Sequence, residues 1–461
     1  MSQLHAGFSR VDITPMVGIS LKGYYGERIA KGTLDPTEAT ALALRIGDVT
    51  ALILSVDVVG IPTPVVSEYR DAIAAAAGLP REAIFIHSVH IHTGPDIVPP
   101  DRNGTPKPEV VAKINEYRSF LGHRLVDASL SAIEDLSPAT MGYAVGRAEN
   151  VAYIRRFRMK DGSVKTNPGV GNPEILEPLE EIEERVSVIR FDRVGKNDIV
   201  LFHFGLHPDV IGGYHFTADW PGFARRTLEA ALPDTSAIFL NGCQGDVNHV
   251  NVNMASKDYA GGVRMDFTNG VRYDHARYIG RAIAGAVLGV YDKVIATDPD
   301  AIRFTELFSK CAANKAAPEQ LAEAHRIHEL HIAGRDSEIS GEVGKGMDFV
   351  TVVAEAGRMV RLENGPDFFP YSMTGLSLGN VALIGIPGEP FTGIGRGIRT
   401  DGERDWELVL PCCIVNGYEA YFPTKKAYDE GGYEARASSY KCGVAEQMIA
   451  EGLEILKDLR K

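Results

Sequence analysis

Short apolar runs alternate with longer amphipathic stretches along the whole chain. The short runs are rich in Val, Ile and Leu. Such runs are typical of buried strands, because they are too short to form separate helices. We therefore predict strands at Ala41–Ile46, Ala51–Val59, Ala83–His87, Val186–Phe191, Ile199–Phe204, Ala237–Leu240 and Val381–Ile386.

The stretches between these runs have the periodicity of helices. We predict helices at Pro64–Ala77, Glu109–Ile133, Gly222–Ala231, Tyr273–Tyr291, Ala317–Ile332 and Ala445–Leu459. Because strands and helices intermix from end to end, the pattern favours an α/β (mixed α+β) fold in which helices cover a mixed β-sheet.

No repeat or low-complexity linker divides the 461 residues. We therefore expect one large domain over residues 1–461. Within it, segment 315–345 has the pattern of a polar helix with a Gly-rich return. We expect a helical insertion there, which serves either as a lid or as a contact within a homo-oligomer.

Composition and charge limit the kinds of molecule that this protein can be expected to bind. The formal net charge of −13 argues against a nucleic-acid partner and against attraction to anionic membranes. No apolar stretch approaches the roughly 20 residues of a membrane span. Five cysteines without a CxxC pair indicate a reducing compartment, and no secretory signal is visible, so we expect a cytoplasmic protein with a small-molecule substrate.

Histidines stand at the ends of two predicted strands. Positions two apart in an extended chain face the same side, so His90 and His92 are expected to project together. Imidazole suits zinc, and one ring can bind the metal while its neighbour works beside it. The alternative is a hydrogen-bonded pair of loop histidines. A lone strand-end residue such as His207 is more often structural, but it repeats the arrangement of the first pair.

Three further segments carry polar groups at the ends of apolar runs. Segment 239–249 enters a Gly-bounded polar loop, where α/β proteins place ligands. Its Cys243 is either a nucleophile or, as we favour, a buried inert thiol. Glu389 follows Pro-Gly and is either a site carboxylate or one favoured by a helix N-terminus. Five tyrosines in segment 418–440 are explained by packing, by oxyanion stabilisation or by metal binding.

Taken in order, these segments resemble the catalytic domain of the neutral (alkaline, non-lysosomal) ceramidases. The opening 7–15, with Gly23-Tyr24 after it, is similar to the start of that family. Segment 90–95 looks like the family motif His-Thr-His-Ser-Gly-Pro. Further matches are His207-Pro208, Pro387-Gly388-Glu389, the tyrosine block from 416 to 434 and, less closely, Asn150-Val151 with Arg155.

The resemblance implies a Zn²⁺ site and a set of residues around it. By that match, His90, His207, Glu389 and Tyr421 bind the zinc. His92 lies close to the activated water as general base and proton donor. Arg155 and Tyr433 stabilise the oxyanion, and Tyr433 also contacts substrate.

Two departures from the family pattern bear on the substrate. Asn248 replaces the serine of the family's Gly-Asp-x-Ser-Pro-Asn loop, and we assign Asn248 to substrate orientation. We also expect a divergent homologue of the bacterial type, without the large C-terminal β-domain of those enzymes. The substrate of this chain is therefore not expected to be ceramide itself.

These observations give one function and two alternatives. The first is zinc-dependent hydrolysis of an amide (C–N) bond in a small or lipid-like substrate through a zinc-activated water. The second keeps the zinc and uses a polar, sugar-derived, ester or lactone substrate, because loop 95–108 is too polar to form a groove for a long acyl chain. The third is a catalytically altered metal-binding protein.

Overall fold

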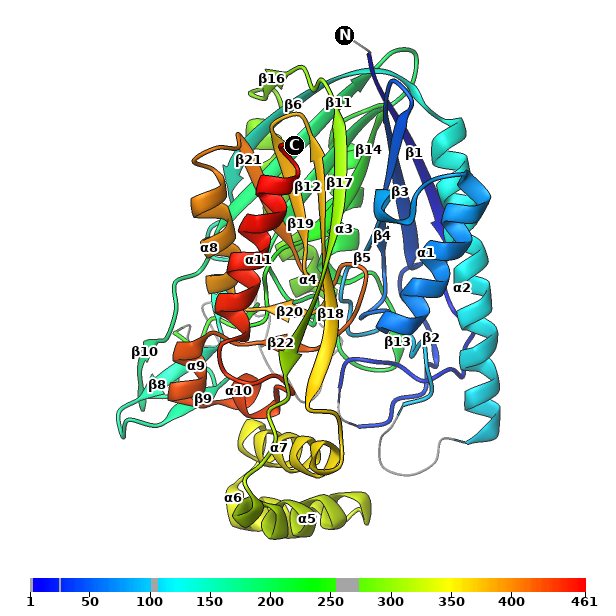
Figure 1. Ribbon diagram of the computed structural model, residues 1–461. Coiled ribbons are helices and arrows are strands. Elements are labelled where there is room, and N and C mark those ends of the chain that lie inside the picture. Colours follow the sequence, from blue (N-terminus) through cyan, green and yellow to red (C-terminus); the bar gives the residue numbers. More distant parts are fainter. Residues whose placement is uncertain (1–2, 25, 101–106, 254–272) are drawn as a thin grey trace.

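Two β-sheets lie face to face between layers of helices (Figure 1). The computed structural model describes residues 3–24, 26–100, 107–253 and 273–461. In this part of the chain, nine strands form the larger sheet, in the order β14-β12-β11-β6-β1-β3-β4-β5 with β16 on β6. Their bounds are β1 (Leu4–Asp12), β3 (Glu38–Ile46), β4 (Val49–Val56), β5 (Ile84–Ser88), β6 (Ser137–Arg147), β11 (Arg185–Arg193), β12 (Asp198–Phe204), β14 (Thr235–Asn241) and β16 (Ile295–Thr297).

The smaller sheet has four strands among the described residues: β17 (Ile302–Ala312), β18 (Phe368–Leu378), β19 (Val381–Gly385) and β21 (Leu408–Cys412). One apolar cluster fills the space between the two sheets. Leu42 and Ile53 reach it from the larger sheet, and Leu376, Leu383 and Leu410 reach it from the smaller one. All five side chains are buried, so removal of apolar surface from water holds the two sheets together.

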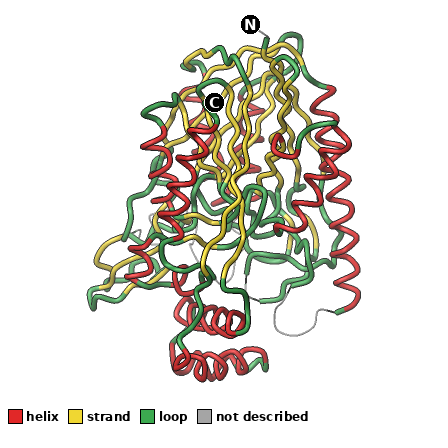
Figure 2. Tube along the Cα trace, viewed as in Figure 1, coloured by secondary structure: helices red, strands yellow, loops and turns green. Residues whose placement is uncertain are grey.

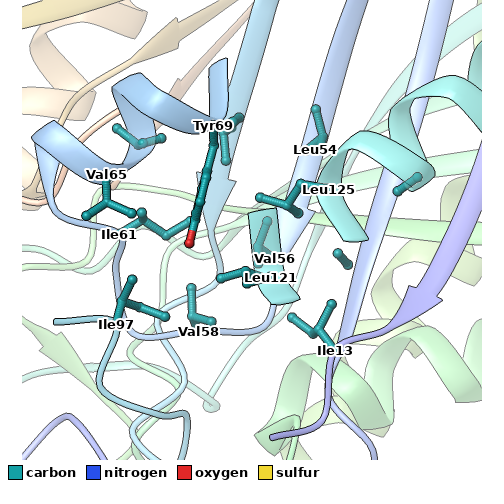
Figure 3. Close-up of a cluster of buried hydrophobic side chains, with 14 of the residues drawn as sticks. Ile13, Leu54, Val56, Val58, Ile61, Val65, Tyr69, Ile97, Leu121 and Leu125 are labelled. Carbon is teal, nitrogen blue, oxygen red and sulfur yellow. The ribbon is translucent and has the colours of Figure 1, made fainter. Parts of the chain in front are cut away.

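Helices cover the outer faces of both sheets, as the red segments on either side of the yellow strands show (Figure 2). On the larger sheet, α1 (Thr63–Ala77) and α2 (Pro108–Glu134) cover one half, and α3 (Asp219–Ala231) and α4 (Tyr273–Tyr291) cover the other. On the smaller sheet lie α8 (Thr392–Gly402) and α11 (Val444–Asp458). Figure 3 shows one of these interfaces, where Tyr69 of α1 and Leu121 of α2 meet Leu54 of β4.

Three parallel strand pairs set the position of the loops. In each of β4–β5, β12–β14 and β19–β21, neighbouring strands run in the same direction. Their carboxyl ends therefore meet at one edge of the molecule. There the two end strands of the larger sheet come together, because Asn241 N donates to His87 Nε2 at 2.9 Å. Bridges from His87 to Val415 and from Gly242 to Cys412 join the smaller sheet to this edge.

Several short elements lie along this edge, which we call the carboxyl edge. Glu389–Pro390 (β20) pairs with Tyr421–Phe422 (β22), and Val247–Asn248 (β15) pairs with Tyr153–Ile154 (β7). The remaining short elements are β2 (Gly32–Thr33), η1 (Arg81–Ala83), β8 (Arg156–Met159), β9 (Val164–Thr166), β10 (Ile175–Pro178), β13 (His215–Phe216), α9 (Lys425–Glu430) and α10 (Tyr433–Ala437).

A group of three helices projects at the bottom of Figure 1: α5 (Pro318–Ile332), α6 (Asp336–Val343) and α7 (Met347–Glu363). The first two occupy the segment in which we expected a helical insertion. The three helices pack around their own apolar cluster, which includes Ile327, Ile339 and Met359. The chain leaves the smaller sheet at Ala312 and re-enters it at Phe368, and these two residues pair across β17 and β18.

The mixed α/β fold expected from the sequence is confirmed. Each of the seven predicted strands and six predicted helices has a counterpart in the structure. The polar loop 95–108 is described only in part, because residues 101–106 lie outside the described residues. Within the described segments, no helix is long and apolar enough to cross a membrane.

Candidate metal centre

His90 reaches the centre of the carboxyl edge through an unusual backbone torsion. Strand β5 ends at Ser88. His90 has a backbone φ of +80°, which residues other than glycine rarely adopt. The backbone N–H of His90 donates to Val58 O at 2.8 Å, which holds this conformation. Because Val59 O can only accept, the nitrogen Nδ1 that lies 2.7 Å from it carries the proton. In the neutral ring, the Nε2 atom of His90 therefore presents a lone pair.

His207 is oriented in the same way, by hydrogen bonds from its ring to backbone carbonyls. Its Nδ1 lies 2.9 Å from both Gln244 O and Val247 O, so Nδ1 carries the proton and Nε2 presents a lone pair. The residue is fully buried, and Trp220 Nε1 donates to its backbone oxygen at 3.3 Å. Burial lowers the pKa of His207 below its ordinary value, which keeps the ring neutral at pH 7.

Glu389 faces both of these lone pairs. Its Oε2 lies 3.3 Å from His90 Nε2 and 3.2 Å from His207 Nε2. The side chain is 2% exposed, and Oε1 accepts a hydrogen bond of 3.1 Å from the hydroxyl of Tyr418. Burial alone would raise the pKa of Glu389, but positive charge on the facing imidazole of His90, together with hydrogen bonding to and charge on His207, holds it well below its usual range. The carboxylate is therefore ionised.

These three residues form a cluster of electron-pair donors that fits a divalent cation. With both Nδ1 protons directed to backbone carbonyls, the neutral rings turn both Nε2 lone pairs toward the carboxylate oxygen, so a positive charge, either an added proton or a cation, must lie among the three atoms. The separations of 3.2 and 3.3 Å match the spacing of about 3.3 Å between ligands bound at roughly 2.0–2.1 Å in a tetrahedral zinc site. Two imidazoles and one carboxylate are also a ligand set that zinc accepts.

His92 lies beside this cluster. Its Nε2 is 3.2 Å from His90 Nε2, and the ligand atoms of His90, His92 and His207 all lie within 4.8 Å of one another. Among the described residues, His92 Nδ1 is buried and makes no hydrogen bond. Burial, followed by the neighbouring His90, lowers the pKa of His92 well below its ordinary value. His92 is thus a neutral imidazole, and its Nε2 donates to the Nε2 lone pair of His90 while that atom holds no cation.

The sequence argument for His90 and His92 was right about their proximity but wrong about its cause. We expected alternation along an extended strand to place the two rings on one side. Strand β5 ends before either residue, and the loop that follows brings the rings together, with their centroids 4.8 Å apart. The metal-ligand and proton-transfer roles both remain open to His92 on this geometry.

Tyr421 and Arg155 lie next to the carboxylate. Tyr421 pairs with Glu389 across β20 and β22. The guanidinium of Arg155 lies 5.3 Å from the centre of the Tyr421 ring. Burial and then the Glu389 carboxylate raise the pKa of Tyr421 well above its usual range, and Arg155 opposes this rise. In the protein without a cation, Tyr421 is therefore a neutral phenol.

A buried ion pair fixes Arg155. Its Nε donates to Glu434 Oε1 at 2.7 Å, and its Nη2 donates to Gly245 O at 2.8 Å. The ring of Tyr433, which precedes Glu434, lies 5.7 Å from the ring of Tyr421 in an edge-on arrangement. The structure therefore brings Arg155, Tyr421 and Tyr433 together on one side of the histidine cluster.

Asn248 is held by a different network. It belongs to β15, where it follows Val247, whose carbonyl orients His207. The amide Nδ2 donates to Asn167 Oδ1 at 2.6 Å, and Oδ1 accepts from Val250 N at 2.9 Å. Both ends of this side chain are thus engaged in shaping the loop.

Several contacts at the centre had no sequence signal. Tyr418 stands in the tyrosine cluster, but its spacing gave no reason to prefer it as the partner of Glu389. The carbonyls of Val59, Gln244 and Val247 are backbone groups, which the side-chain pattern does not report. Cys243 is buried and its pKa is raised by burial, which agrees with our interpretation of an inert thiol. All five cysteines are free.

Comparison with known structures identifies the fold. The crystal structure of neutral ceramidase from Pseudomonas aeruginosa matches with a TM-score of 0.71, over 100% of this chain and 75% of that chain. The chain has the neutral ceramidase fold. A structure described as ceramidase complexed with C2 matches this ceramidase-like chain with a TM-score of 0.70, over 100% of this chain and 76% of that one.

The ceramidase fold is retained here at low sequence similarity. Identity is 16% to the Pseudomonas aeruginosa structure and 15% to the other. No protein-family model and no curated protein matches the sequence. The roles of individual residues must therefore be argued from their own geometry rather than from the ceramidase fold.

Proposed function

We propose that this chain is a zinc-dependent hydrolase that cleaves an amide bond. One observation carries the proposal: the Nε2 lone pairs of His90 and His207 face the ionised Oε2 of Glu389 at 3.3 and 3.2 Å. A cation removes the mutual repulsion of these groups. The neutral ceramidase fold, seen in structures of enzymes named for ceramide, supports an amide as the bond.

His90, His207 and Glu389 would hold the metal, with Tyr421 as a fourth ligand. A zinc ion in this position lowers the pKa of a water molecule toward ~7 and polarises a carbonyl group. Tyr421 would approach the metal from the strand that pairs with Glu389. Tyr418 orients Glu389 by donating to the oxygen that does not face the imidazoles.

His92 is the group that moves the proton. As a neutral imidazole, its Nε2 accepts a proton from the attacking water and then gives it to the departing amine. The unpartnered Nδ1 suits this role, because once a cation takes up the His90 lone pair, no other hydrogen bond among the described residues would hold the ring in one tautomer.

Arg155 and Tyr433 stabilise the oxyanion that develops on the carbonyl oxygen. The Glu434 and Gly245 contacts hold the Arg155 guanidinium in place before substrate arrives, so little reorganisation is needed during the reaction. Asn248 acts on the substrate indirectly, because its amide group is occupied by Asn167 and Val250.

Metal content of the purified chain tests the proposal. We expect one zinc per chain in the wild type, and loss of both metal and amide hydrolysis in His207→Ala. The matched control is His203→Ala, which removes a partly buried histidine of the preceding strand whose Nε2 lies 3.0 Å from Pro411 O. This variant should keep its metal. A folded wild type that binds no divalent metal, even after reconstitution, would overturn the proposal.

A further inference from the structure

A cavity of about 300 Å³ opens beside Tyr433, away from the histidines. One wall is strand β9 with Lys165 and Thr166, and another is helix α10, which Tyr433 begins. The third wall is the first part of α7, with Met347 and Thr351. The projecting group of helices therefore contributes a wall to the cavity.

Two short chains of contacts connect this cavity to the candidate metal centre. The ring of Tyr433 packs edge-on against Tyr421 at 5.7 Å. The hydroxyl of Thr166 donates to Glu434 Oε2 at 2.9 Å, and the other oxygen of Glu434 accepts from Arg155. The cavity is thus separated from Arg155 and Tyr421 only by the side chains of Tyr433, Thr166 and Glu434.

The lining of the cavity is predominantly polar. Lys165 and Asp348 form an ion pair with an Nζ to Oδ2 distance of 2.9 Å, and Arg436 lies on the same lining. The hydroxyls of Thr166 and Thr351 donate to Glu434 and to a backbone carbonyl, so they are left as acceptors. The aliphatic side chains of the wall are Val164, Val343, Met347 and Val352, and the cavity surface that the lining presents is nevertheless more polar than apolar.

This lining is unfavourable for an alkyl chain. Each methylene gains about 0.8 kcal/mol only where it meets apolar surface. An alkyl chain here would instead cover a Lys–Asp pair and two hydroxyls without replacing their hydrogen bonds to water. A group with its own hydroxyls makes those hydrogen bonds, and the ring of Tyr433 offers a flat surface to its C–H face.

We propose that this cavity binds a polyhydroxylated, sugar-like part of the amide substrate. This inference rests on the proposed function, and it assigns the substrate class. The hydroxyls of the ligand donate to the Thr166 and Thr351 oxygens and to Asp348, and they accept from Lys165 and Arg436. The group belongs either to the amine or to the acyl side of the amide bond.

The test compares three small amides on the zinc-reconstituted full chain. N-acetylglucosamine carries its hydroxyls on the amine side, N-ethylgluconamide carries them on the acyl side, and N-hexylacetamide has none. We expect one of the two hydroxylated amides to bind at least tenfold more tightly than N-hexylacetamide in calorimetry and to be hydrolysed with the higher kcat/KM. The preferred compound identifies the side of the bond.

Two variants tie the preference to the cavity. Met347→Trp fills it, and we expect at least a tenfold loss of affinity for the preferred hydroxylated amide. Val350→Trp is the control, because Val350 lies on the same helix outside the cavity lining. Lys165→Met removes the ion pair, and it should weaken binding of the hydroxylated amide while strengthening binding of N-hexylacetamide.

The outcomes separate this inference from the proposed function. If the chain hydrolyses amides but prefers N-hexylacetamide, or if Met347→Trp and Val350→Trp behave alike, the cavity assignment is wrong and the hydrolase stands. If no amide is hydrolysed but the hydroxylated amide binds and Met347→Trp abolishes binding, the cavity assignment stands and the hydrolase is wrong.

Discussion

The conformation of His90 illustrates how single residues build this site. Its positive φ costs of order 1 kcal/mol or more, and it persists because two backbone contacts, to Val58 and Val59, hold it. Residues in such conformations concentrate at functional sites. The strain therefore agrees with a role for this side chain beyond packing.

Sequence could predict the candidate metal ligands at this scale but not the groups that orient them. His90, His92, His207 and Glu389 each follow an apolar run, and that pattern marks strand ends. The partners that fix their orientation are a tyrosine among five and three backbone carbonyls. A carbonyl has the same chemistry at every residue, so only the folded chain shows which of them receives a histidine proton.

Replacing Tyr418 tests the importance of such an orienting group. Tyr418→Phe removes the hydrogen bond to Glu389 Oε1 and leaves the ring in place. Loss of a partner of this kind lowers metal affinity by roughly 10- to 100-fold. We expect zinc affinity, measured by competition with a chelator, to fall within this range while the circular dichroism spectrum is unchanged.

Tyr428→Phe provides the matched control. The hydroxyl of Tyr428 donates to Ser438 Oγ at 3.0 Å, so this variant also loses a partly buried tyrosine hydrogen bond, but one that does not involve Glu389. Its zinc affinity should equal that of the wild type. Equal zinc affinity in all three proteins would exclude Tyr418 as an orienting group.

At the scale of elements, most continuous apolar runs were predicted as strands, although the fully buried β21 was missed, and mixed strands were not predicted. Strands β3, β4 and β12 are buried along nearly their whole length, so their sequences are mostly apolar. Strand β18 was missed because Pro370 and Gly375 interrupt it, and both residues argue against a strand. Gly375 has a packing reason, since an added Cβ would lie 2.3 Å from Ile455 of α11.

Strand β17 was missed for a different reason. It is a long strand at the edge of the smaller sheet, and most of its residues are only partly buried. Its apolar and polar residues therefore follow no strict alternation. What holds it to the first half of the chain is a charge pair, which sequence cannot reveal: Arg70 of α1 donates to both carboxylate oxygens of Glu306 at 3.0 and 2.9 Å.

Removing the Glu306 charge should destabilise the fold. Both side chains are at most 2% exposed, so Glu306→Gln leaves the Arg70 charge buried without a partner. We expect a loss of about 3–5 kcal/mol in the free energy of unfolding, measured by urea denaturation at pH 7. Glu68→Gln, which breaks an exposed pair with Arg118, should change it little.

The Arg70–Glu306 pair makes the stability of the fold depend on pH. Burial would raise the pKa of Glu306, but hydrogen bonds from Arg70 and the Arg70 charge lower it below its ordinary value of 4.5. Because the folded-state pKa is depressed, the stabilisation is present above 4.5 and is lost as pH falls through the folded-state value. The difference in stability between wild type and Glu306→Gln should therefore shrink below pH 4.5. A difference that grows on acidification would contradict this assignment.

At the scale of the whole molecule, sequence indicated the class of fold but not the arrangement of its layers. The apolar runs specify buried strands without specifying which strands become neighbours. The carboxyl edge is assembled from β5, β12, β14, β19 and β21, which lie in two sheets. Bringing His90 to Glu389 depends on how the sheets face each other, and this follows from the complementarity of two apolar surfaces rather than from any local pattern.

The projecting helices offer a prediction at this scale. A variant in which an Asn-Gly turn replaces residues 315–365 joins β17 to β18 directly, because Ala312 and Phe368 already pair. All candidate metal ligands lie outside this segment. We expect the variant to fold and to keep one zinc per chain, with a lower melting temperature because the Glu355–Arg436 and Arg358–Arg436 contacts are lost.

Elemental analysis and thermal melts followed by circular dichroism check this prediction. A folded variant without zinc would show that the projecting helices support the metal centre itself. The arrangement of the described residues argues for the opposite, since the helices have an apolar cluster of their own and meet the rest of the chain mainly at β9 and α10.

The pairing of Ala312 with Phe368 has an evolutionary consequence. Because these two residues pair, mutations, insertions and deletions between them should leave the strand register, and with it the reactive groups, unchanged. Selection can then change the substrate specificity of the protein without changing the arrangement of its reactive groups. Relatives of this chain should diverge fastest between Ala312 and Phe368. A directed-evolution library confined to this segment should yield new substrate preferences with little loss in the yield of folded protein.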